Sequence, residues 1–180
     1  MSKLTLSRLL AACLMVGLTG AVATAQQEVR SAIGVRLGSP YSLSYKQAIS
    51  DEGMVELLLG ARPYFGFRYS YFSVGGAYLH HLPLEVELAD GPVNAYFGAG
   101  ATAQFWRYRD GFFGPERLRS DFGDLGIRVG PYVGAQWTPG GSDVEITLDW
   151  APSLLVGRLP VSSLRWGYYT LGVRYVLSRR

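Results

Sequence analysis

The chain has few of the residues that commonly stabilise small exported proteins or anchor membrane proteins. Its single cysteine, Cys13, lies near the start, so the rest of the chain has no disulfide framework. Beyond residue 25 no apolar run approaches the roughly 20 residues that a helix needs to cross a bilayer. Charged residues make up 17% of the chain, against about 25% in soluble domains. These absences exclude a disulfide-stapled scaffold and a bundle of membrane helices.

Histidine is also scarce, with His80 and His81 as the only two. Neighbours on a strand point to opposite faces, so this pair does not share a metal ion without a bulge. No cysteine or carboxylate cluster follows at ligand spacing. A serine hydrolase with Ser70 or Ser73 and Asp90 is an alternative, but no motif connects these residues. We therefore predict no catalytic, cofactor-binding or metal-binding residue.

Residues 1–25 have the three parts of a secretory signal peptide. Lys3 and Arg8 form a cationic start, an apolar core follows, and Ala23-Thr24-Ala25 is a small-residue cleavage site. We expect export, cleavage near Ala25, and a single mature domain over residues 26–180.

A lipoprotein signal ending at Cys13 is the alternative to this leader. Against it, the apolar run before Cys13 covers only residues 9–12, and most of the apolar core follows it. Loss of Lys3 and Arg8 leaves 15 basic residues against 14 acidic ones in the mature chain. This near balance argues against nucleic acid as a partner.

The final part of the chain alternates between two kinds of side chain. From residue 169 onward the odd positions are apolar or aromatic, and the even positions include Gly172 and Arg174. Alternation with period two is typical of a strand with two different faces. The odd positions are Tyr169, Leu171, Val173, Tyr175 and Leu177.

The same alternation recurs along the mature chain and predicts about eight strands. A period of two, with many of the 23 glycines inside the segments, argues against helices. Gly75-Gly76 is interpreted as a bulge that shifts the register. The pattern predicts an all-β fold, an antiparallel up-and-down transmembrane β-barrel with a filled lumen. The segments are 29–37, 41–49, 54–62, about 67–82, 93–106, 125–137, 144–151 and 164–177.

The faces opposite the apolar ones carry charge. In a barrel of this size we expect the charges to form a salt-bridge network that fills the lumen. We expect Arg174 to pair with Glu145, Asp149 or Glu56. The alternative is a constricted, weakly anion-preferring pore. The inward charges are predicted to be Arg30, Arg36, Lys46, Arg62, Arg128, Arg174, Glu56, Glu145 and Asp149.

The connections are expected to alternate between two ends of the barrel. Short turns near Asp51, Asp90 and Pro139 are assigned to the inner end, and Pro83–Pro92 is a longer inner segment without an assigned role. Aromatic side chains at strand ends and outward positions are expected to form interfacial girdles. Phe112, Phe113 and Trp106 are candidates for a carbohydrate or lipid contact. The outer connections are predicted at Gly38–Pro40, Pro63–Gly66, Tyr108–Gly123 and Gly157–Ser163.

Three segments carry a family likeness: Ile33–Lys46, Ala95–Ala101 and Leu148–Ser153. With them the chain resembles the small, about eight-stranded outer-membrane β-barrel proteins of Gram-negative-type bacteria. Such barrels serve as adhesins, lipid-modifying enzymes and stabilising proteins. Tyr169–Leu177 also resembles the signal read by the barrel-assembly machinery, although Leu177 stands where that signal usually has an aromatic residue, and three residues follow it.

The resemblance implies an outer-membrane location, with membrane lipids and the barrel-assembly machinery as partners. It implies a structural or surface-interaction role, without identifying a surface ligand. Three alternatives remain open at this point. They are a lipid-modifying acyl hydrolase or transferase that uses His80 or His81, a narrow porin-like pore, and a soluble periplasmic lipid carrier. The carrier predicts polar outward faces and an apolar lumen.

Overall fold

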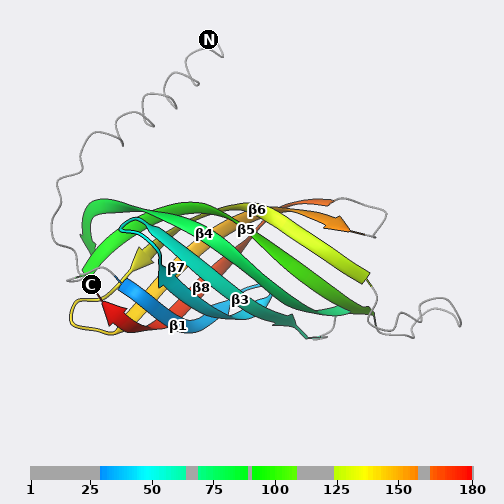
Figure 1. Ribbon diagram of the computed structural model, residues 1–180, viewed down its shortest axis with the longest axis horizontal. Helices are drawn as coiled ribbons and strands as arrows, with labels where there is room; N and C mark the ends of the chain where they lie inside the picture. The colour runs from blue at the N-terminus through cyan, green and yellow to red at the C-terminus, as the bar shows by residue number, and fades with distance from the viewer. Residues whose placement is uncertain (1–28, 64–68, 89–90, 109–123, 158–162, 180) are drawn as a thin grey trace, which may run out of the picture.

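The computed structural model describes residues 29–63, 69–88, 91–108, 124–157 and 163–179, and every regular element in them is a β-strand. Each strand pairs antiparallel with the next, and β1 pairs with β8 to close a barrel (Figure 1). The predicted fold class is confirmed as an eight-stranded, antiparallel, up-and-down barrel. The strands are β1 Val29–Leu37, β2 Tyr41–Ala48, β3 Gly53–Arg62, β4 Tyr69–Leu88, β5 Gly91–Tyr108, β6 Asp124–Trp137, β7 Val144–Gly157 and β8 Ser163–Arg179.

The described residues include no helix with the length and hydropathy needed to cross a bilayer. Side-chain exposure follows the predicted alternation. Leu43 is 58% exposed and Tyr169 is 73% exposed, whereas their strand neighbours Ser44 and Thr170 are buried. Among the described residues, 15 polar or charged side chains and 10 hydrophobic ones are buried. This barrel therefore reverses the usual distribution, in which the buried residues are mainly apolar.

β4 and β5 extend past their predicted segments at one end. Pro83–Pro92 belongs to the hairpin between them, since Leu88 pairs with Gly91. β3 follows β4 only as far as the pair formed by Gly53 and His80. The hairpin therefore projects beyond the β3 side of the barrel, which accounts for the length of this segment.

Two expectations about local geometry are wrong. Gly75 and Gly76 pair with β3 without a break. The irregularity of β4 lies instead after Pro83, because proline has no N–H to donate to the ladder. Arg30 is exposed rather than inward, because the pairing of β1 with β8 shifts on both sides of Ser31. A shift of one residue moves a side chain to the other face of a sheet.

β7 also continues past its predicted end at residue 151. Proline usually ends a ladder, but a bulge between Ala151 and Ser153 carries the strand past Pro152 to Gly157. The strand therefore contributes a second buried stretch, which includes Ser153 and Leu155.

Connections alternate between the two ends of the barrel. Val29 pairs with Arg179, so the described ends of the chain meet at one end, together with the turns at 49–52 and 138–143 (Figure 1). We call this the N/C end. The other end carries the turn Gly38–Pro40, and we call it the loop end. The predicted signal peptide, Asp90, 64–66, 109–123 and 158–162 lie outside the described residues.

Candidate functional site

Six ionisable side chains meet inside the barrel. Three are cations and three are carboxylates, and they come from β1, β2, β3, β7 and β8. Their side chains are only 0–4% exposed. We call this group the central network. It consists of Arg36, Lys46, Arg174, Glu56, Glu145 and Asp149.

Arg174 connects a carboxylate on β3 with a carboxylate on β7. Its Nη1 donates to Glu145 Oε1 at 2.9 Å, and its Nη2 donates to Glu56 Oε1. Lys46 Nζ also donates to Glu145 Oε1, at 3.0 Å. The predicted network is confirmed, and two of the three partners named for Arg174 are its partners.

Arg36 extends the network toward the loop end. Its Nη1 donates to Glu56 Oε2 at 3.1 Å and its Nη2 to Asp149 Oδ2 at 2.6 Å. The same Nη2 donates to Thr170 Oγ1, whose hydroxyl donates to Asp149. Arg36 and Arg174 therefore share Glu56, and the six charges form one connected group.

Strand register brings these groups together. Lys46 lies opposite Glu56 on β2 and β3, and Glu145 lies opposite Arg174 on β7 and β8. All four occupy inward positions, and closure of β1 on β8 places the two pairs within reach across the lumen. The network thus depends on the closed barrel and not on any single hairpin.

Hydroxyl and amide groups satisfy most of the remaining polar atoms. Arg174 Nε donates to Ser44 Oγ at 2.7 Å, and Arg174 Nη1 donates to Thr147 Oγ1 at 2.9 Å. Lys46 Nζ donates to Gln136 Oε1 at 2.8 Å. Buried ion pairs are stable only when such additional bonds replace the lost water. Among the described residues, Glu145 Oε2 has no hydrogen-bond partner.

Two glycines give Arg174 its space. A Cβ on Gly34 would lie 2.9 Å from Arg174 Cγ, and a Cβ on Gly172 would lie 2.9 Å from Arg174 Nη1. Gly34 lies opposite Arg174 on the neighbouring strand β1, and Gly172 lies two residues before Arg174 on β8 itself. Their lack of a side chain lets the guanidinium cross the lumen, which the network then fills.

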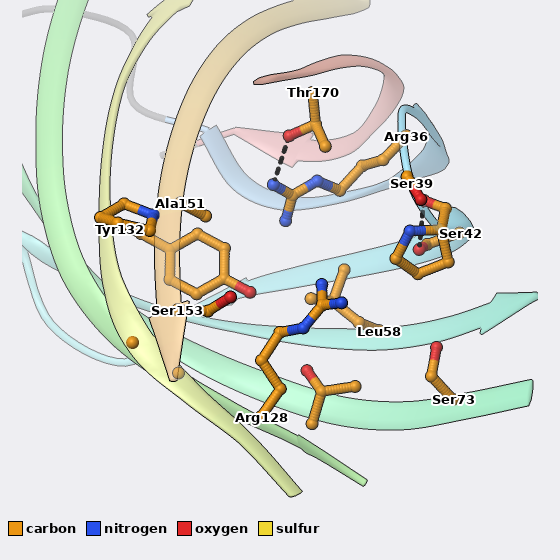
Figure 2. A pocket seen from close by; sticks show the side chains of 15 residues that line it. Arg36, Ser39, Ser42, Leu58, Ser73, Arg128, Tyr132, Ala151, Ser153 and Thr170 are labelled. Carbon is orange, nitrogen blue, oxygen red and sulfur yellow. Dashed lines mark hydrogen bonds between the residues drawn. The ribbon is translucent and has the colours of Figure 1, made fainter. Parts of the chain in front are cut away.

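The other predicted inward cations lie outside the network. Arg62 is half-buried near the loop end of β3, and Arg128 is half-buried on β6. Arg128 enters a small cavity of ≈ 50 Å³ at the loop end. Arg36, Thr170 and the turn residue Ser39 also line this cavity (Figure 2), as does Pro40.

The histidines do not join a hydrolase arrangement within the described residues. His80 Nε2 lies 3.4 Å from Glu52 Oε2, and the His81 ring bonds Gln136 Oε1 at 3.0 Å. The two rings occupy opposite faces, as predicted. Ser73 lines the cavity near the loop end, seven residues along β4 from His80, which is about 23 Å at the rise of a strand.

One aromatic residue differs from its predicted place. Trp106 is 4% exposed and packs against Tyr71, with ring centroids 4.6 Å apart, and beside Leu155. It therefore belongs to an internal cluster rather than to an interfacial girdle or an exposed loop. Phe112 and Phe113 lie outside the described residues.

The cavity was not predicted from the sequence. Its signal is a pair of prolines, Pro131 on β6 and Pro152 on β7, which lie in the stretch where these two strands do not pair.

Fold and interior together define the class as a closed, eight-stranded antiparallel barrel with a charged, filled lumen and an apolar exterior. No family model, curated protein or solved structure matches the chain.

Proposed function

We propose that this protein is an integral β-barrel of a bacterial outer membrane, with a structural or surface-interaction role. The observation that carries the proposal is the apolar exterior of a closed barrel whose interior is charged. We call the large hydrophobic side chains exposed on the eight strands, from Ile33 on β1 to Leu177 on β8, the apolar belt.

The apolar belt is unfavourable in water. Soluble monomers rarely expose contiguous apolar patches beyond about 600 Å², whereas large hydrophobic residues are exposed here on every strand. Lipid chains remove this cost, since burial of one large apolar side chain is worth roughly 1.5–3 kcal/mol. A closed barrel also pairs its backbone groups internally, as a bilayer requires.

The same distribution argues against a soluble lipid carrier. A carrier needs an apolar lumen to hold an acyl chain, but here the lumen holds the central network and its hydroxyl partners. Within the part of the chain that the structure describes, no histidine, serine and carboxylate are assembled to support the hydrolase alternative. Neither a carrier nor an enzyme is therefore proposed.

The proposed partners follow from the membrane location. Outer-membrane lipids contact the apolar belt, and the barrel-assembly machinery inserts the chain after export and cleavage near Ala25. The exposed row Tyr169, Leu171, Val173, Tyr175 and Leu177 supports recognition by that machinery, because the row is presented on one face of β8.

Fractionated envelopes test the proposal. We expect the protein in the outer-membrane fraction, migrating on a gel at a different position before and after boiling, because a closed barrel resists unfolding by cold detergent. A periplasmic marker and a known outer-membrane barrel serve as controls. Recovery in the soluble periplasm, folded and without lipid, would contradict membrane insertion.

A further inference from the structure

The cavity at the loop end has walls rich in hydrogen-bond donors. Arg36 from β1 and Arg128 from β6 both reach it, with the Tyr132 side chain beside them (Figure 2). The Arg36 guanidinium carbon lies 5.5 Å from the centroid of the Tyr132 ring. The other polar side chains of the lining are Ser and Thr hydroxyls, and the lining contains no carboxylate. Arg36 already donates to Glu56 and Asp149, so the Arg128 guanidinium and the Ser hydroxyls form the part of this surface that is suited to a negative ligand.

Two lining hydroxyls have no hydrogen-bond partner among the described residues. These are Ser39 Oγ and Ser153 Oγ, and both atoms are buried. Ser153 as a whole is 5% exposed. Buried polar atoms in folded proteins nearly always have a hydrogen-bond partner. These two hydroxyls therefore indicate that a polar group occupies the cavity and bonds to them.

Strand irregularity builds the cavity. β6 and β7 pair at Val129 with Leu154 and again at Val133 with Trp150, but no pair joins the residues between. The bulge of β7 lies in this gap. Bulges occur often beside functional sites, where they redirect side chains. Ser153 follows this gap on the same inward face as Thr147 and Asp149, and its side chain lines the cavity.

We infer that this cavity binds a small tetrahedral oxyanion, phosphate or sulfate, from solution. A volume of ≈ 50 Å³ holds about four water molecules at 10–15 Å³ each, so it accepts one compact ion and excludes a large organic ligand. Arg128 brings a guanidinium, whose geometry matches the oxygens of such an ion, to the cavity. Ser39 and Ser153 donate to oxygens of the same ion.

A lipid headgroup carries the same phosphate chemistry, but the interior position favours the free ion. Arg36, which lines the cavity, is 3% exposed and is bonded to Glu56 and Asp149 of the central network. An ion bound there lies inside the barrel and away from the apolar belt. This site is built by the barrel itself, so it does not depend on membrane insertion.

Thermal unfolding of the folded full-length mature protein in a neutral, phosphate-free detergent tests the inference. Inorganic phosphate is titrated at constant ionic strength set by chloride. We expect phosphate to raise the melting temperature, and the affinity to fall about tenfold or more in Arg128→Gln, since a charge-assisted bond is lost. Arg30→Gln removes the same charge from an exposed position and should bind as the parent does.

Ser153→Ala provides a variant that keeps every charge and should bind phosphate more weakly than the parent. A second arm replaces free phosphate with micelles that contain an anionic phospholipid. Stabilisation only in that arm would assign the phosphate to lipid and overturn the free-ion site. Equal effects of phosphate on the parent, Arg128→Gln and Ser153→Ala, or equal effects of chloride and phosphate, would also overturn it.

Discussion

Arg174 is the single residue on which the interior depends most. It donates to Glu56, Glu145, Ser44 and Thr147, which come from β2, β3 and β7. Removing one partner of a buried pair costs more than removing both, because the remaining charge loses its compensation. The two carboxylates keep Arg36 and Lys46 as partners, so the network would be weakened rather than abolished.

We expect Arg174→Met to lower the free energy of unfolding by about 3 kcal/mol, at the lower end of the range for broken buried pairs. Urea unfolding in lipid vesicles, followed by tryptophan fluorescence, measures the change. Arg30→Met at an exposed position is the matched control and should change stability by less than about 0.5 kcal/mol. A double-mutant cycle with Glu56→Gln should show coupling. Equal small effects of both arginine variants would contradict the network's role.

Glycine at position 172 leaves room for the Thr147 hydroxyl and the Arg174 guanidinium. A Cβ there would lie 2.3 Å from Thr147 Oγ1 and 2.9 Å from Arg174 Nη1. We expect Gly172→Ala to destabilise the barrel by about 1–3 kcal/mol, as overpacking does. At Gly76 the nearest atom is 3.2 Å away, so Gly76→Ala should cost less in the same assay. A larger loss at Gly76 would contradict this explanation.

At the scale of elements, the far part of the β4–β5 hairpin projects beyond the end of β3. β3 pairs with β4 only up to His80, while β4 and β5 continue to pair to Leu88 and Gly91. The β4 arm of the far part has no β3 partner, whereas its β5 arm is held to β6 by the pairs at Val93 and Asn94. Trp137 Nε1 also donates to the Leu88 carbonyl at 2.7 Å. The remaining pairs of β4 with β3 and of β5 with β6 lie outside this part, so we expect that barrel closure does not require it.

We expect replacement of residues 83–94 by Asn-Gly to leave a closed barrel. Leu82 and Ala95 are directly paired, so a two-residue turn of this type can join them. The shortened protein should keep the change in gel mobility on boiling that the full protein is expected to have. Loss of that change, with the parent treated alongside, would indicate that the hairpin is needed for closure.

The sequence predicts the strands and their faces because a period of two is a local property. The opposite faces of Leu43 and Ser44 follow from their adjacent positions on a strand, whichever strands pair with it. It predicts a set of partners for Arg174 but not the final pair, since facing positions across a lumen follow from closure and register. Arg30 was misplaced because its face depends on register shifts, which are set by pairing with a neighbouring strand. Ser153 was missed because β7 continues past Pro152, beyond its predicted end.

At the scale of the whole molecule, the central network closes the lumen. Its six side chains are nearly inaccessible to solvent, and small barrels have interiors that side chains fill. We expect the reconstituted protein to give no steady conductance in a planar bilayer. A porin reconstituted in the same way is the control. Stable channels formed by the folded, unmodified protein would contradict the filled lumen.

If the apolar belt lies in a membrane, the stability cost of a charged substitution in it should depend on depth in the bilayer. Leu57 is 56% exposed at the middle of β3, and Leu37 is 48% exposed at the end of β1. In lipid vesicles we expect Leu57→Arg to cost about 2–4 kcal/mol and Leu37→Arg about 0–1 kcal/mol, because arginine is most unfavourable at the bilayer midplane. Urea unfolding of both variants beside the parent measures the two costs.

A barrel that folds in water instead exposes both leucines to the same solvent. Each arginine would then change stability by no more than about 0.5 kcal/mol, as surface substitutions usually do. The difference between the two positions, rather than either value alone, therefore reports the surrounding medium. Equal costs at Leu57 and Leu37 would contradict insertion even if the protein were found in a membrane fraction, because adsorption to a membrane surface creates no gradient along the strands.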